Sequence, residues 1–279
     1  MERRVEDFDA QEEWQNYDAY VEPVPRPKPP PEVRRPCPFE GEEFARQHTE
    51  NVDSFLKRLP PSKTWATPDL SYIWITNPFL NFTSRKDANN QHVPGAEDEM
   101  PTGGDIATLV EGGKERLNFV SSFIEDSQKP GVSYDRDMLD QESSKAGADA
   151  AKDILDLAQN VRVTFGKWLI SCTTWEADTT WEIIAKATVR NELGIAAKVM
   201  ARTTQDTRET INICVYTCNF AWKEDVTRVA KKLKELKAIK RTARLNYQPD
   251  AYTYLGIKYG NQWKIQESIY DSHSLLLYA

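Results

Sequence analysis

Apolar residues recur along the chain with two different periods, and each period predicts one type of secondary structure. A spacing of three to four residues predicts helices over 52–59, 105–126, 148–161, 177–193 and 223–239. Alternation rich in β-branched and aromatic residues predicts strands over 70–76, 166–172, 195–203, 209–217, 242–247, 252–259 and 262–268.

Local signals sharpen two of these elements. Thr179 and Glu182 fit a capping box, in which each side chain bonds a backbone N–H at the start of a helix. Gly194 suits the end of the same helix. The polar turn TQDTR joins strands 195–203 and 209–217 into a hairpin.

The order of elements predicts the fold class. Helices inserted between hairpins indicate an α+β protein in which helices pack on one face of a mainly antiparallel sheet. The last three strands follow the final long helix, and Gly260-Asn261 supplies the turn between the last two.

Composition divides the chain into an arm and a domain. Residues 1–38 are predicted to be a disordered arm, acidic at first and then Pro-rich, with half of all the prolines in EPVPRPKPPPEVRRPCP. The Pro-rich part, 23–38, is either a plain linker or a docking peptide for SH3-like proteins. Residues 39–279 are predicted to form a single domain, with a mobile polar insertion at 127–147.

Charge and cysteine usage exclude several classes of protein. The net charge is −7 and the pI is about 5.2, which argues against a general nucleic-acid coat but not against a local basic patch. Four scattered cysteines and three scattered histidines predict neither a disulfide framework nor a metal site. The sequence has no signal peptide and no run of eighteen apolar residues, so we expect no membrane span and a cytoplasmic or nuclear location.

Two sequence resemblances refine the fold. The strand GKWLI, the following helix with its Trp, the hairpin, the basic helix and a Tyr-bearing strand together resemble the cap-binding translation initiation factor 4E. On GKWL, ICVYT, PDAYTYLGI and NQW, the chain is identified as a member of the basophilic-leukaemia-expressed protein family over about residues 50–273. The resemblance implies an initiation factor 4E-like fold with a curved sheet, and that family has no established activity.

The resemblance also raises the question of cap binding. The initiation factor holds a methylated guanine between two tryptophans, which the resemblance would place in loops 77–95 and 158–165. Neither loop contains a tryptophan. We therefore expect the chain to lack the usual tryptophan clamp.

Basic residues offer two candidate anion sites. Lys198, Met200 and Arg202 share one face of a predicted strand, and Arg208 lies across the turn. The resemblance places phosphate-binding cations on this hairpin, although a solvated hairpin tip would carry the same charges. The segment 223–244 is also strongly basic, either as a footprint for RNA or as a solvated helix face.

Aromatic residues offer candidate stacking surfaces. Trp168 and Trp181 are predicted to be core residues, whereas Trp175 lies between a strand and a helix and is expected to be accessible. Tyr252 and Tyr254 share a face of a predicted strand, where they form either a stacking platform or buried core.

These observations favour a binding module over an enzyme. The sequence contains no Gly-rich phosphate loop and no Ser elbow, so we assign no catalytic residue and no cofactor. The leading hypothesis is a non-catalytic module for RNA or a nucleotide phosphate, using Lys198, Arg202, Arg208, Trp175, Tyr252 and Tyr254. The rival hypothesis is a protein-interaction adaptor that uses the Pro-rich arm and helix faces.

Overall fold

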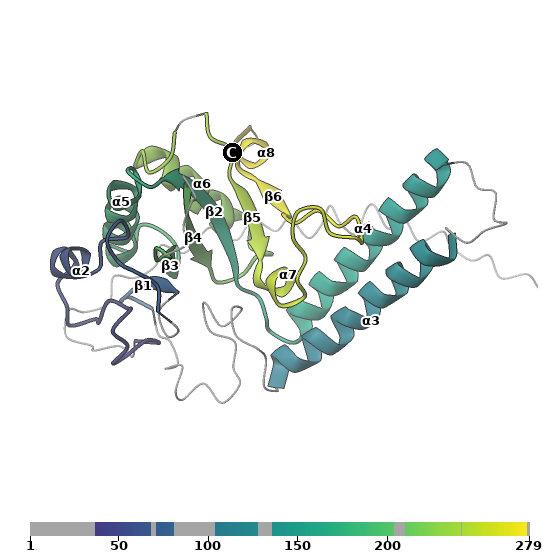
Figure 1. Cartoon of the computed structure of the whole chain (residues 1–279), viewed down its shortest axis with the longest axis horizontal. Coiled ribbons are helices and arrows are strands. Elements are labelled where there is room, and N and C mark those ends of the chain that lie inside the picture. The colour runs from purple at the N-terminus through teal and green to yellow at the C-terminus, as the bar shows by residue number, and fades with distance from the viewer. Residues whose placement is uncertain are drawn as a thin grey trace, which may run out of the picture. The chain divides into compact units, whose positions relative to one another are not determined.

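An antiparallel sheet organises the part of the chain that the structure describes (Figure 1). The computed structural model describes residues 37–67, 71–80, 104–127, 136–203, 210–240 and 242–277. Within them the strands are β1 (Tyr72–Thr76), β2 (Gly166–Thr173), β3 (Ala196–Met200), β4 (Thr210–Thr217), β5 (Asn246–Pro249) and β6 (Tyr270–Asp271). Their order across the sheet is β1-β3-β4-β2-β5-β6, and every pairing is antiparallel.

Helices are inserted between the strands, and the five described helices that precede β5 follow the predicted order, whereas the two short ones after it were not predicted. They are α2 (Val52–Arg58), α3 (Gly104–Ser127), α4 (Arg136–Asn160), α5 (Ala177–Val189), α6 (Lys223–Glu235), α7 (Asp250–Tyr254) and α8 (Ser272–Leu277). The predicted fold class, α+β with a curved antiparallel sheet and helices, is confirmed. Among the helices described, none is long and apolar enough to cross a membrane.

One face of the sheet packs against helices. Alternation along β2 sends Trp168 and Ile170 to this face, where they join a core that residues of α3, α4, α5 and α6 complete. Trp168 is fully buried, and its indole N–H donates to the carbonyl of Val226 at 3.0 Å. Trp181 is also fully buried in this core, so the core assignment of both tryptophans is confirmed.

Among the described residues, an apolar cluster covers the opposite face at the β1 side. There Phe39 stacks on Trp74 with ring centroids 4.8 Å apart, and Trp74 stacks on Tyr216 at 5.6 Å. These rings form a second apolar cluster with the segment that precedes α2. Further along the sheet, β4, β2 and β5 are left to form the floor of a cleft.

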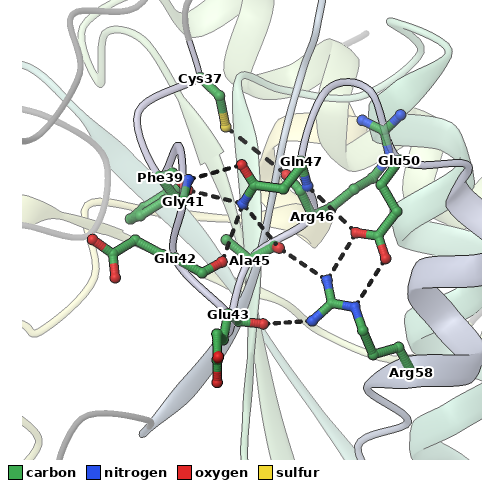
Figure 2. Close-up of polar contacts among 10 residues, drawn as sticks. All are labelled: Cys37, Phe39, Gly41, Glu42, Glu43, Ala45, Arg46, Gln47, Glu50 and Arg58. Carbon is green, nitrogen blue, oxygen red and sulfur yellow. Dashed lines mark hydrogen bonds and ion pairs between the residues drawn. The ribbon is translucent and has the colours of Figure 1, made fainter.

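Two polar side chains fasten the covering segment (Figure 2). The Gln47 amide donates to the carbonyls of Phe39 at 3.0 Å and Glu42 at 3.1 Å. The Arg58 guanidinium forms two hydrogen bonds with the Glu50 carboxylate, at 2.9 and 2.8 Å. Because two nitrogens of one planar group meet two oxygens of the other, this pair fixes orientation as well as distance.

Cys37, at the end of the predicted arm, is buried. Its thiol lies 3.8 Å from both the carbonyl oxygen of Arg46 and the hydroxyl of Thr76. Burial raises the pKa of this thiol. Residues 1–36 lie outside the described residues, so the disordered arm over 1–38 and the single domain over 39–279 stay predictions.

The two last predicted strands are wrong. Residues 252–259 begin within the short helix α7, and 262–268 have no regular structure. Gly256 and Gly260 both have positive φ, at 70° and 71°, which breaks the extended path. Of the aromatic residues that suggested a strand, Tyr252 is buried on the helical turn α7, whereas Tyr259 lies beyond it and is exposed.

One helix start and one helix cap also differ from prediction. Helix α4 begins at Arg136, so the second half of the predicted insertion 127–147 is helical, in keeping with its good helix formers. Helix α5 begins at Ala177, and the expected capping box at Thr179 does not form. Glu182 instead pairs with Lys186 at 2.7 Å, one helical turn later.

Candidate anion-binding cleft

A cleft of about 1250 Å³ lies over the open part of the sheet. Its walls come from three places: the sheet face, the turn between β2 and α5, and the segment between α6 and β5. Of the described residues that line it, two are acidic, Glu176 and Glu235, and six are basic: Lys167, Lys198, Lys234, Lys237, Lys240 and Arg244. The two basic stretches that the sequence left separate, the hairpin and 223–244, thus meet in one cleft.

Lys198 brings a buried charge to the cleft wall. Its residue is only 2% exposed, because β3 places it opposite Trp74 on one side and Cys214 on the other. The ammonium lies 4.1 Å from the ring centroid of Tyr72 and 5.1 Å from that of Trp74. Aromatic faces attract a cation at these distances, so the rings stabilise the charge where water is largely excluded.

Lys167 is neutralised by a partner. Its ammonium lies 3.0 Å from Asp250 Oδ1 and 2.9 Å from Thr253 Oγ1, and both charged side chains are almost completely buried. The pair forms because alternation along β2 puts Trp168 in the core and Lys167 on the opposite face. The net positive charge of the cleft therefore depends on the other basic residues.

The far lip of the cleft is the C-terminal end of α6 and the segment after it. Lys237 has a positive φ of 56° and ends the helix, and the Ala238 N–H donates to the carbonyl of Leu233 at 3.2 Å. Lys240 lies 3.8 Å from Glu176, and Arg244 lies 3.2 Å from Asp271. Both pairs are exposed at the cation, so each basic group remains available to a competing anion.

Trp175 projects from the near lip and is 83% exposed. Its turn is closed by Thr173, whose hydroxyl donates to Glu176 Oε2 at 2.7 Å, while the Glu176 N–H donates to the Thr173 carbonyl at 3.1 Å. The Thr173 hydrogen bonds, and next the charge of Lys240, lower the pKa of Glu176. The turn is thus a fixed support for an exposed indole at the rim of a basic cleft.

Comparison with known proteins places the chain in a family. The family model of the basophilic leukemia-expressed protein Bles03 matches residues 1–256. The chain belongs to this family. The match extends to the N-terminus, beyond the region over which the sequence resemblance was drawn.

Solved structures that resemble the chain are of eIF4E-3. One is the Caenorhabditis elegans protein with the 4E-binding protein Mextli and a cap analog, at 22% identity over 31% of this chain and 51% of that one, with a TM-score of 0.28. Another is Ascaris suum eIF4E-3 with an m2,2,7G cap, at 17% identity over 39% and 58%, with a TM-score of 0.30. The chain thus spans little more than half the length of these structures.

The structure places the predicted basic residues of the hairpin in different surroundings. Lys198 and its neighbour Met200 both line the cleft. Arg202 turns away from them, with its guanidinium 5.0 Å from the ring centroid of Trp65 and its Nη1 donating to the Ser62 carbonyl at 3.1 Å. Arg208 lies outside the described residues.

The two tyrosines of the predicted stacking platform do not share a strand face. Tyr252 lies on α7 rather than on a strand and is 1% exposed, and burial raises its pKa to about 12. Tyr254 is half-buried and packs against the main core. Their strand-like spacing misled the prediction, because a helix separates such residues by about 200° around its axis rather than placing them on one face.

The sequence patterns singled out neither Lys167, which lines the cleft, nor Trp65, which lies outside its lining and pairs with Arg202. The signal for Lys167 was present, since a core position at Trp168 puts its neighbour on the other face of the same strand. No local pattern identified Trp65, because its partner Arg202 is distant in sequence.

Proposed function

We propose that this protein is a non-catalytic binding module for RNA or a nucleotide phosphate, and that the cleft is its site. The observation that supports the proposal is the meeting of Lys198 with Lys234, Lys237, Lys240 and Arg244 around a single cleft. Overall the chain is acidic, with a net charge of −7, so this concentration of positive charge is not a property of the whole surface.

The charges suit an anion that enters from solvent. Lys198 supplies a fixed charge at the wall, while Lys237 and Lys240 are exposed at the opposite lip. Phosphates bound by such groups release counterions, and each contact therefore adds to the salt dependence of binding. A carboxylate ligand would satisfy the same charges but would not use the aromatic rim.

Trp175 is what favours a nucleotide over a simple anion. An indole that is 83% exposed on a rigid turn contributes little to the stability of the fold. Stacking of a base on such a ring, however, contributes about 1–3 kcal/mol to the free energy of binding. The stack is compatible with any base, since every base has a flat face.

The cleft does not reproduce the tryptophan clamp. Among the described residues, no ring pair joins two tryptophans, and the stacked Trp74 is buried between Phe39 and Tyr216. We therefore propose recognition by phosphate contacts with one-sided stacking.

Neutralising the far lip tests the proposal. The double variant K237Q/K240Q removes two exposed charges without burying any group, so folding should be unaffected. We expect its affinity for fluorescein-labelled octauridylate to fall about tenfold or more at low salt. The matched control, K114Q/K145Q, makes the same charge change on α3 and α4, at residues that do not line the cleft.

The control separates a site from a general charge effect. The proposal predicts that K114Q/K145Q binds within about twofold of the native protein, because distant charges are screened over about 10 Å at ordinary salt. Equal losses in the two variants, or no loss in either, would contradict a site in the cleft.

A further inference from the structure

Trp65 is a second exposed indole, and it is held by a cation. The residue is 50% exposed, and the Arg202 guanidinium stands over its ring at 5.0 Å. A short parallel bridge joins the two residues: the Arg202 N–H donates to the Thr64 carbonyl at 2.9 Å, and the Ala66 N–H donates to the Arg202 carbonyl at 2.6 Å. Backbone and side chain together therefore fix the ring.

The hydrogen bonds that hold Trp65 in place lead to α5, the helix that Trp175 precedes. Arg202 donates to the carbonyl of Ser62, whose own N–H and hydroxyl donate to the Asp178 carboxylate at 2.8 and 2.6 Å. Asp178 is in the first turn of α5, and Trp175 stands just before that helix. The two indoles are thus attached to one rigid part of the fold.

The strand order puts both indoles at the same end of the sheet. Both β2 and β3 are antiparallel to β4, which lies between them, so β2 and β3 run in the same direction. Trp175 follows the last residue of β2, Thr173, and the Trp65 bridge follows the last residue of β3, Met200. Thr173 and Met200 both line the cleft.

The strands that lead to the two indoles are not neighbours. Two strand spacings, about 10 Å, separate β2 from β3, and Trp65 stands on a further segment that is bridged to Arg202 after β3. A base held between two rings needs them only about 7–8 Å apart, since each contact is about 3.5–4 Å. Rings attached to strands that are not neighbours suit two different bases of one extended strand.

The size of the cleft points the same way. Pockets for small ligands have volumes of about 300–1000 Å³, and this cleft has about 1250 Å³. Its cations are also spread from Lys198 on β3 to Arg244 before β5, rather than gathered about one point. Proteins that bind single strands combine such a charged track with separate stacking rings.

We propose that the ligand of the cleft is a single-stranded polynucleotide several nucleotides long, with one base stacked on Trp175 and another on Trp65. This inference rests on the proposed function, since it presumes that the cleft binds nucleotide phosphates. Arg202 lies over one face of the Trp65 ring, and the base would stack on the other face.

A length series with one matched set of variants tests the inference. The affinities of UMP, tetrauridylate and octauridylate are measured by fluorescence titration for the native protein, W65A, W175A and W222A. Trp222 is the control, because it is also exposed, at 57%, but stands at the N-terminal end of α6, away from the residues that line the cleft. A thymidine octanucleotide distinguishes RNA from DNA as the source of the strand.

We expect octauridylate to bind at least tenfold more tightly than UMP. W65A and W175A should each lose about 5- to 100-fold for octauridylate, W222A should lose less than twofold, and W65A should bind UMP as the native protein does. Equal affinity of the native protein for UMP and octauridylate would overturn the inference while leaving the proposed function intact. Equal affinities of W65A and W222A for octauridylate would do the same. If the native protein binds none of the nucleotides, both proposals fail.

Discussion

The buried pair of Lys167 and Asp250 allows a prediction that separates stability from ligand binding. The side chains are 5% and 0% exposed, and the ammonium lies 3.0 Å from the carboxylate. The perturbation is to remove one partner at a time, in D250A and K167M, and then both partners in the double variant.

The expected magnitude follows from burial. Removing one partner of a buried pair leaves the other charge without compensation and costs about 3–5 kcal/mol. That is a large part of the 5–15 kcal/mol by which domains are usually stable. Thr253, at 2.9 Å from the ammonium, offers a hydroxyl but no charge, so it offsets little of the loss in D250A.

Urea denaturation, monitored by circular dichroism, measures the free energy of unfolding of the native protein, the two single variants and the double variant. We expect each single variant to lose about 3–5 kcal/mol and the double variant to lose less than either one. Because the pair has no net charge, the double variant should also bind octauridylate within about threefold of the native protein. A loss below about 1 kcal/mol for D250A, or additive losses in the double variant, would refute the reasoning.

Further predictions address the rim, the core, acid stability and the N-terminal segment. W175A should keep its melting temperature, whereas W168A should lose about 3–5 kcal/mol in denaturation, because only the second ring is buried. Hydrogen bonds from Ser274 are the main cause that lowers the pKa of Asp271 to about 2, from an ordinary 3.8. Its stabilising effect is therefore present above pH 3.8 and lost toward pH 2, so D271N should show a smaller acid-induced loss in pH-dependent melting. Deleting residues 1–33 should leave octauridylate binding within about twofold, since every residue that the proposals assign to binding lies between positions 65 and 244. A pull-down with an SH3 domain tests the Pro-rich segment.

Much of the fold follows from local periodicity. The alternation in GKWLI and ICVYT gave β2 and β4 with the correct buried tryptophan, because side chains on a half-buried strand obey a period of two. The prediction for the C-terminal region was wrong for the same reason. Tyr252 and Tyr254 have strand-like spacing, but they lie in a single helical turn that is bounded by Pro249 and Gly256. Propensity was overridden there by tertiary burial.

Only part of the candidate site could be predicted from the sequence. Lys198 and the basic stretch after α6 could be identified separately, but their meeting depends on the sheet order, which no local pattern contains. The Trp65–Arg202 pair is likewise a product of a long-range bridge. The alternation along β2 does indicate that Lys167 lies on the face opposite Trp168. Considering both faces of the strand would have identified it as a residue of the site.

The central claim is that the cleft binds through phosphates, and the salt dependence of binding tests it most directly. The dissociation constant of octauridylate is measured for the native protein and for K237Q/K240Q from about 50 to 300 mM salt. The account predicts a linear fall of log affinity with log salt, and a slope shallower by about 1.4 in the variant, since each single-strand phosphate contact contributes about 0.7. Salt-independent binding, or identical slopes for the two proteins, would contradict it.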